Sequence, residues 1–188
     1  MKLDEGKLKT IIEPYYAKGR AGDWEHVQRV VKWVKELGRG RDDMDVLITA
    51  AYLHDIGWYG VAPKEKIDFD TLNLLEQQAN LNTEPLVSEV LAELGVDKNI
   101  TKKVLRLIAA ADKHRSQSDD EAIVVDADNL SKLCIEHIEQ KFKPESYVEA
   151  LKMFEREIPN RIATDKGKQL FPALLVELKK VVTAQVNK

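Results

Sequence analysis

The chain has 188 residues, of which 44% are hydrophobic and 32% are charged, and its formal net charge is -3 at pH 7. This balance is typical of a soluble globular protein and argues against a nucleic-acid polymer as partner, which usually requires a basic face. The single cysteine excludes an intrachain disulfide, and no run of about 18 apolar residues is present to cross a membrane. Because the first residues lack the apolar core of a signal peptide, we expect a cytoplasmic protein.

Helical periodicity dominates the first half of the chain, and no segment alternates as a strand would. Helices are predicted over residues 7–18 and 23–37, with Asp23 as N-cap of the second. A third helix, over residues 46–56 and capped by Asp42 or Asp43, is apolar nearly all round. We therefore expect it to be the central, buried helix.

The second half of the chain continues the helical pattern after a loop over residues 57–66, which we expect to influence specificity. Further helices are predicted over residues 70–80, 83–95, 98–114 and 121–142, and two more follow Pro144. Neither a repeat nor a composition break suggests a second domain. The prediction is an all-α protein with one domain over residues 1–188.

The dipeptide His54-Asp55 lies at the end of the most apolar predicted helix. A buried carboxylate beside a buried imidazole is costly unless a partner compensates for the lost hydration. Backbone groups or an arginine are the commoner partners of an isolated His-Asp pair, and a metal ion is the alternative.

Two other predicted helices also carry polar residues among apolar ones. His26 lies one position away from a valine stripe, and Asp126 and Asp128 interrupt the apolar run VVDADNL. Helical periodicity does not decide between the two acids, because both have apolar neighbours four residues earlier. Residues two positions apart on a helix point about 200° apart, so only one of them should face a common site.

These residues together form a plausible metal-ligand set drawn from three apolar helices. Two imidazoles and two carboxylates suit a divalent ion such as Mn, Fe, Co, Ni or Zn and do not select among them. Mg is retained as a candidate, whereas calcium prefers an all-oxygen shell. We predict one divalent ion.

The order and spacing of four fragments resemble the HD-domain superfamily of metal-dependent phosphohydrolases. GDWEHVQRVVKWV is similar to the first-histidine motif of one branch, and LITAAYLHDIG is similar to the defining His-Asp helix. LVSEVLAELGVDKNITKKVLRLIAAADKH and EAIVVDADNL resemble the segments that follow. The resemblance covers about residues 22–136, implies an HD-type helical bundle, and leaves residues 144–188 as additional C-terminal helices.

The resemblance implies which residues hold the ion. His26, His54 and Asp55 match the metal ligands of the superfamily, and the motif Ala-Asp-x-Leu favours Asp128 over Asp126 as the last one. Two departures are visible in the sequence: Gly22 replaces a histidine that often precedes Asp-Trp, and IGWYG follows His-Asp where many relatives carry an acid or a lysine.

The number of histidines favours one ion over two. Members that hold two metals use two further histidines before the last acid, and this chain has only His114 there. His137 follows the last acid, and we expect it on the surface. This count also weakens a di-iron oxygenase as an alternative function.

The activity implied by the resemblance is hydrolysis of a small phosphorylated substrate, with a nucleotide favoured. His114 is a candidate for contact with the phosphate, or else a cation at a helix C-terminus. Arg29 is a candidate either to hold the phosphate or to orient a carboxylate. The alternative function is a non-catalytic, metal-containing nucleotide-binding module, and the sequence is also compatible with a homodimer.

Overall fold

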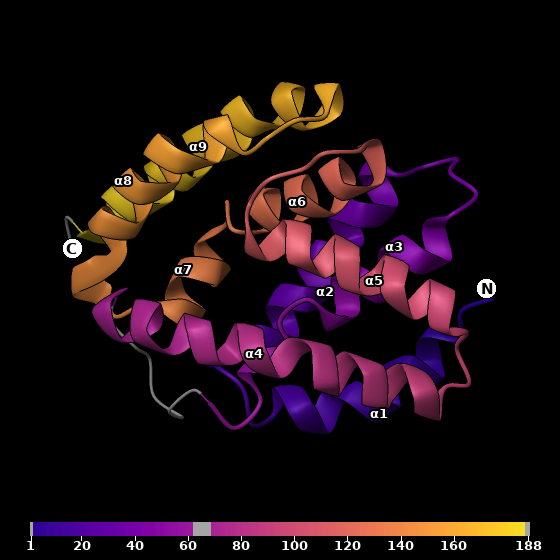
Figure 1. Cartoon of the computed structure of the whole chain (residues 1–188). Helices are drawn as coiled ribbons and strands as arrows, with labels where there is room; N and C mark the ends of the chain where they lie inside the picture. The colour runs from indigo at the N-terminus through magenta and orange to yellow at the C-terminus, as the bar shows by residue number, and fades with distance from the viewer. Residues whose placement is uncertain (1, 62–68, 187–188) are drawn as a thin grey trace.

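The computed structural model describes residues 2–61 and 69–186. Within these ranges the chain forms nine α-helices, three short 3-10 helices and no strand, which confirms the all-α prediction (Figure 1). The α-helices are α1 (Glu5–Tyr16), α2 (Asp23–Leu37), α3 (Met44–Leu53), α4 (Phe69–Glu93), α5 (Lys98–Asp112), α6 (Asp119–Ser131), α7 (Ile135–Lys141), α8 (Tyr147–Glu157) and α9 (Asp165–Val186). The 3-10 helices are η1 (Ile56–Trp58), η2 (Pro144–Ser146) and η3 (Ile158–Asn160).

The first hydrophobic cluster lies among α1 to α6, and α3 is at its centre. Every residue of α3 from Leu47 to Leu53 is buried, as the apolar character of this segment predicts. The valine stripe of α2 packs into the same cluster, together with the apolar faces of α5 and α6. Asp97 caps α5 by accepting the backbone N–H of Asn99 at 2.8 Å. None of the described helices has the length and apolar composition that crossing a membrane requires.

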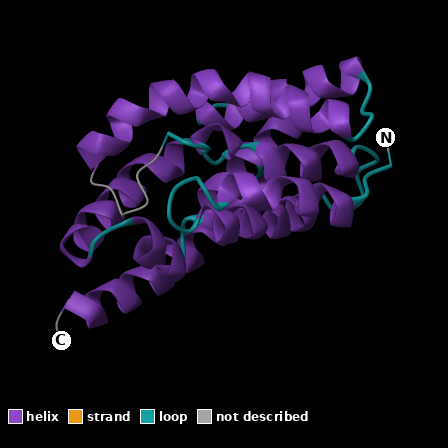
Figure 2. Ribbon diagram, turned by 90° about the horizontal axis from the view of Figure 1, so that it is seen from below, coloured by secondary structure: helices purple, strands orange, loops and turns teal. Residues whose placement is uncertain are grey.

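A second hydrophobic cluster joins α7, α8 and α9 to the end of α6. In Figures 1 and 2, α8 and α9 lie side by side at one end of the molecule, and the N-terminus lies at the other end. Trp33 and Leu37 of α2 pack against both clusters. Lys166 of α9 also donates to the carbonyl and carboxylate oxygens of Glu36, at 2.9 and 2.5 Å. The C-terminal helices are therefore anchored on α2.

Residues 70–80 and 83–95, predicted as two helices, mostly belong to the single helix α4, so that prediction was wrong. Thr83 does not cap a new helix, because its hydroxyl donates to the carbonyl of Ala79 within the same one. Pro85 lacks the N–H of a helical residue, but it lies on the exposed side, where water can satisfy the free carbonyl.

The 3-10 helix η1 packs closely against α4 through Gly57. A Cβ atom at this position would collide with the carbonyl oxygen of Ala79 and the hydroxyl of Thr83. The third helix was predicted to extend to residue 56, but α3 already ends at Leu53. Part of the loop predicted over residues 57–66, namely 62–66, lies outside the described residues.

The segment 121–142, predicted as one long helix, is divided into α6 and α7. Ser131 at the end of α6 donates its hydroxyl to the carbonyl of Asp128 at 2.7 Å, and Cys134 adopts an extended backbone with φ -144°. Side-chain bonds of this kind compete with helix continuation. The break changes the direction of the chain and brings α7 against α2.

Candidate metal centre

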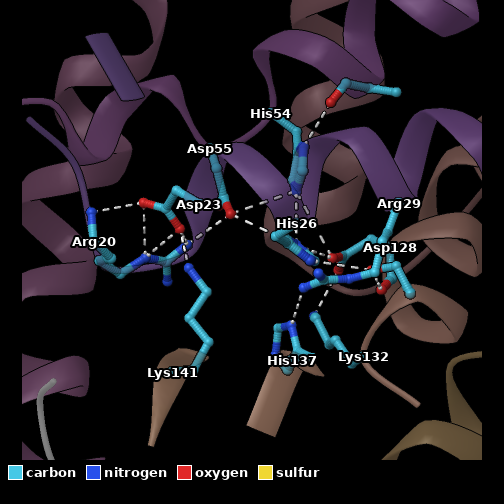
Figure 3. Close-up of polar contacts among 12 residues, drawn as sticks. Arg20, Asp23, His26, Arg29, His54, Asp55, Asp128, Lys132, His137 and Lys141 are labelled. Carbon is cyan, nitrogen blue, oxygen red and sulfur yellow. Dashed lines mark hydrogen bonds and ion pairs between the residues drawn. The ribbon is translucent and has the colours of Figure 1, made fainter. Parts of the chain in front are cut away.

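Four of the predicted site residues lie together where α2, α3 and α6 meet. His26 projects from α2, His54 is the C-cap of α3, and Asp128 projects from α6 (Figure 3). The Nε2 atoms of His26 and His54 are 3.3 Å apart, and Asp128 Oδ1 is 3.2 and 3.8 Å from them. All three residues are buried. Their donor atoms lie within 4.8 Å of one another, a spacing that one metal ion can span.

Asp55 completes what we call the donor cluster, consisting of His26, His54, Asp55 and Asp128. Its Oδ2 atom is 3.7 Å from His26 Nε2 and 3.6 Å from His54 Nε2. The same oxygen accepts a hydrogen bond from Arg20 Nη2 at 2.6 Å. Burial raises the pKa of Asp55, but the positive charge of Arg20, together with its interactions with His54 and His26, more than compensates, so its pKa is lowered overall.

Hydrogen bonds at Nδ1 determine the tautomer of both imidazoles. His54 Nδ1 is 2.9 Å from the carbonyl oxygen of Ala51, which can only accept, so Nδ1 carries the hydrogen. His26 Nδ1 is 3.2 Å from the hydroxyl of Ser131, whose own hydrogen is donated to the carbonyl of Asp128. His26 Nδ1 is therefore also the donor. Each neutral ring presents an unprotonated Nε2 to the centre of the cluster.

This donor set fits a divalent ion. Two Nε2 lone pairs that face each other at 3.3 Å cannot form a hydrogen bond with each other, and the nearby carboxylate oxygens add negative charge. Burial lowers the pKa of His26 to about 4. Burial raises the pKa of Asp128, but the Lys132 ammonium and His26 lower it well below its usual value. His26, Asp55 and Asp128 are thus in their metal-binding protonation states at neutral pH, and the mixed nitrogen and oxygen donors suit a transition metal.

Asp126 and Asp128, which periodicity left undecided, point in different directions. Asp126 accepts hydrogen bonds from the backbone N–H groups of Ala163 and Thr164, at 2.8 and 2.9 Å, and from the Thr164 hydroxyl at 2.5 Å. It therefore holds the start of α9 against α6. Asp128 is the one that faces the two histidines.

A group of three cations, here called the cation wall, lies beside the donor cluster. Its members are Arg20, Lys132 and Lys141. Arg20 stacks 3.9 Å above the ring of Trp58 and donates to Asp23, and Lys141 also pairs with Asp23. Burial lowers the pKa of Lys141 to about 8, although Asp23 opposes this. Lys132 Nζ donates to Asp128 Oδ2 at 2.7 Å.

The role of Asp23 differs from the predicted one. The N-cap of α2 is Gly22, which has φ 72° and packs against Gln140 of α7. This left-handed conformation favours glycine, and any side chain at Gly22 would collide with Gln140. Asp23 is the first residue of α2, and its carboxylate is used to hold Arg20 and Lys141.

The donor cluster and the cation wall line a cavity of about 430 Å³. The same lining includes what we call the apolar wall, consisting of Phe142, Met153, Phe154 and Ile158, which come from the end of α7, from α8 and from η3. Asp112 of α5 also lines the cavity, and burial, together with the charge of Asp55, raises its pKa to about 7. The cavity therefore joins a charged surface to an apolar one.

His114 lies in the cavity lining, close to the donor cluster. Its Nδ1 atom is 3.8 Å from Asp128 Oδ2 and has no hydrogen-bond partner among the described residues. The backbone of His114 has φ 51°, a conformation that strains a residue other than glycine. Burial and the charge of Lys132 lower its pKa to about 4, so it is neutral and not the predicted C-terminal helix cation.

Two sequence-based expectations need correction. Arg29 does not line the cavity, because its guanidinium is directed to Gln140 Oε1, at 3.0 Å, and to His137 Nδ1, at 3.5 Å. It therefore neither reaches a phosphate in the cavity nor orients a carboxylate. His137, expected on the surface, is buried and lines the cavity, with its ring centroid 5.0 Å from that of His26. The helix break before α7 is what turns it inward.

Sequence reasoning also missed the cation wall. Arg20 lies in the loop KGRAGD and Lys141 on a short helix, and no local pattern distinguishes either residue from a surface cation. The one available signal was Asp23, an acid at the start of an amphipathic helix, which was interpreted as a cap.

Comparisons with known proteins return one match. The family model described as HD domain matches residues 23–133, which include all members of the donor cluster. No curated protein and no solved structure gives a significant match.

Proposed function

Because the chain belongs to the HD domain family, a superfamily of metal-dependent phosphohydrolases, we propose that it hydrolyses a small phosphorylated substrate, most suitably a nucleotide. The observation that carries this proposal is the pairing of the donor cluster with the cation wall in one cavity. His26, His54, Asp55 and Asp128 would hold one divalent ion. Bound there, the ion would lower the pKa of a water molecule and polarise a phosphoryl oxygen.

The cation wall supports an anionic substrate. Arg20 is held against Trp58 and Asp23, so its guanidinium has little freedom to move away from the cavity. Lys141 and Lys132 add two ammonium groups to the same lining. Positive groups fixed in advance beside a phosphoryl group stabilise the negative charge that develops during hydrolysis.

Two groups in the lining, His114 and Asp112, support a role in proton transfer or hydrogen bonding. His114 is neutral, with an unpartnered Nδ1, and the strain of its backbone is the kind found at functional positions. Asp112 has a pKa of about 7, which suits an acid that donates a proton near neutral pH. Asp112 also supplies the acid that the segment after His54-Asp55 lacks.

The apolar wall supports an organic group of limited size on the substrate. A volume of about 430 Å³ is within the range of small-molecule sites and accommodates a phosphate together with a compact ring system. Phe142, Met153, Phe154 and Ile158 offer that group an apolar surface, and Glu157, Arg161 and Asn80 provide polar atoms in the same lining. This division of the cavity favours a nucleotide over an inorganic polyphosphate.

The test is metal reconstitution followed by a panel of phosphate esters. Metal-free protein is loaded separately with Mn, Fe, Co, Ni, Zn and Mg, and release of inorganic phosphate is measured for nucleotides and simple esters. We expect about one ion per chain and hydrolysis that His54→Ala abolishes together with metal binding. Thermal stabilisation by a nucleotide without turnover would instead identify a binding module, and two irons per chain would overturn the single-ion proposal.

A further inference from the structure

His137 occupies a buried position beside the donor cluster, but its surroundings differ from those of the two histidines in that cluster. It lies on α7, and its ring packs against His26, Phe142 and Phe154, with centroids 5.0, 6.4 and 6.0 Å away. Only 5% of the residue is exposed, and the part that is not covered lines the cavity. Because buried polar groups are normally hydrogen-bonded, each ring nitrogen of His137 is expected to have a hydrogen-bond partner.

The first nitrogen is accounted for by Arg29. Arg29 Nη2 is 3.5 Å from His137 Nδ1, and Arg29 Nη1 donates to Gln140 Oε1 at 3.0 Å (Figure 3). A guanidinium can only donate, so Nδ1 of His137 must be the acceptor. A neutral imidazole that accepts at Nδ1 carries its hydrogen at Nε2.

The second nitrogen is therefore a donor, and no hydrogen-bond partner for it exists among the described residues. This is the opposite tautomer to that of His26 and His54, which donate at Nδ1 and present a lone pair at Nε2. To bind a metal through Nε2, His137 would have to carry its hydrogen at Nδ1 instead, where it would point at the N–H donor of Arg29. The geometry thus identifies His137 as a hydrogen-bond donor and not as a metal ligand.

We propose that His137 donates the Nε2 hydrogen to a phosphoryl oxygen of the substrate, and that Arg29 acts as the positioning residue that fixes this tautomer. The inference rests on the proposed function, since it assumes a phosphoryl group beside the donor cluster. It assigns a direct role to a residue after the family match, which ends at residue 133, and an indirect role to Arg29.

The experiment compares three variants of the metal-loaded protein. His137→Phe keeps a ring but removes the donor, His137→Gln keeps a donor, and Glu136→Gln is a control at the exposed neighbouring position on α7. For His137→Phe we expect kcat/KM and the affinity for inorganic phosphate each to fall by at least about tenfold, with metal content retained. His137→Gln should recover most of the loss, and Glu136→Gln should match the wild type.

A spectroscopic measurement tests the role of Arg29 without relying on turnover. In the ¹⁵N NMR spectrum of the wild type, His137 should give the shifts of the Nε2–H tautomer, and Arg29→Met should produce a mixture of tautomers. An Nδ1–H signal for His137 in the wild type, or unchanged phosphate affinity and kcat/KM in His137→Phe, would overturn the inference. If His137→Phe does not fold, the phosphate affinities of His137→Gln and His137→Ala are compared instead. Equal affinities for these two variants would overturn the proposed donor role of His137.

Failure of the proposed function gives a different result. If the wild type binds inorganic phosphate but hydrolyses no ester, the phosphohydrolase proposal fails, and a phosphate affinity that depends on His137 still supports the donor role. If the metal-loaded wild type binds no phosphate, the donor role itself is overturned.

Discussion

The helices before residue 132 and those after it meet at one cavity but contribute different chemistry to it. His26 and Asp128 lie on α2 and α6, and His54 and Asp55 directly follow α3; of these four donors His26, His54 and Asp128 are buried and Asp55 is half-buried. Helices α7 and α8 contribute His137, Lys141 and the apolar wall, and they pack in a second cluster. Metal ligands require positions that are held rigidly, whereas a wall that contacts the organic part of a substrate can vary without disturbing the ion. On the proposed function, the first region would hold the ion, and the second would add the polar contacts of His137 and Lys141 and the apolar surface that selects the substrate.

Asp128→Asn should have the largest effect, because it removes a charged donor from the first region. We expect metal affinity to fall by more than about 100-fold, which exceeds the effect of losing a residue that only supports a ligand. Hydrolysis should be lost in parallel. Metal content measured by mass spectrometry, together with phosphate release, provides the check. Full metal content in this variant would show that the donor cluster is not the metal centre.

Asp126→Ala should lower folding stability without affecting metal binding, in contrast to Asp128→Asn. It leaves the backbone N–H groups of Ala163 and Thr164 without their acceptor, so we expect the free energy of unfolding to fall by about 3 kcal/mol. Metal content of the folded fraction should stay unchanged. Urea unfolding measures the loss, and Thr164→Val, which removes one of the contacts, should show a smaller one. Loss of metal in Asp126→Ala would contradict the assignment.

Asp112→Asn should change how the stability of metal-free protein depends on pH. The pKa of Asp112 is raised to about 7 in the folded state, so the folded state holds this proton more tightly than the unfolded state does. The associated stability is complete below about pH 4 and is lost as the pH rises toward 7. Asp112→Asn avoids that loss, so at pH 8 its free energy of unfolding should exceed that of the wild type by on the order of 2 kcal/mol. This value is smaller than the full pKa shift implies, because partial exposure screens the effect.

Urea unfolding in the presence of EDTA at pH 4.5 and pH 8 measures this difference for Asp112→Asn and the wild type. The gain should be absent or small at the lower pH. An equal gain at both pH values would indicate that the substitution acts through packing and not through the charge of the carboxylate.

Met153→Ala should have the smallest effect and is confined to the second region. Shortening this side chain of the apolar wall should raise KM for esters with an aromatic group by about fivefold, with metal content unchanged. KM for glycerol phosphate should change less, because that substrate has no aromatic group to pack against the wall. Lys152→Ala, at the exposed neighbouring position, is the control. An equal change for both substrates would argue against the division of roles between the two regions.

The sequence by itself determined the helical fold, the central position of α3, and the set of residues that includes the donor cluster. Apolar periodicity and an unusual density of polar groups on apolar helices are local properties, so they can be detected along the chain. They could not show that segments 70–80 and 83–95 are largely one helix, or that segment 121–142 is broken. A side-chain bond to a helix carbonyl occurs in both places, but the helix continues at Thr83 and ends at Ser131, so this local feature does not by itself predict the outcome.

Only the tertiary structure decided what each polar side chain faces. Periodicity indicates that Asp126 and Asp128 lie near apolar neighbours but not which partner each one meets, and it led to the wrong expectation that His137 lies on the surface. Asp126 meets the start of α9, Asp128 meets His26, and His137 meets Arg29, and these contacts join residues far apart in the chain. The cation wall has the same origin, since Arg20 and Lys141 come together only because Asp23 binds both. Such pairings depend on how the helices pack, which no local pattern encodes.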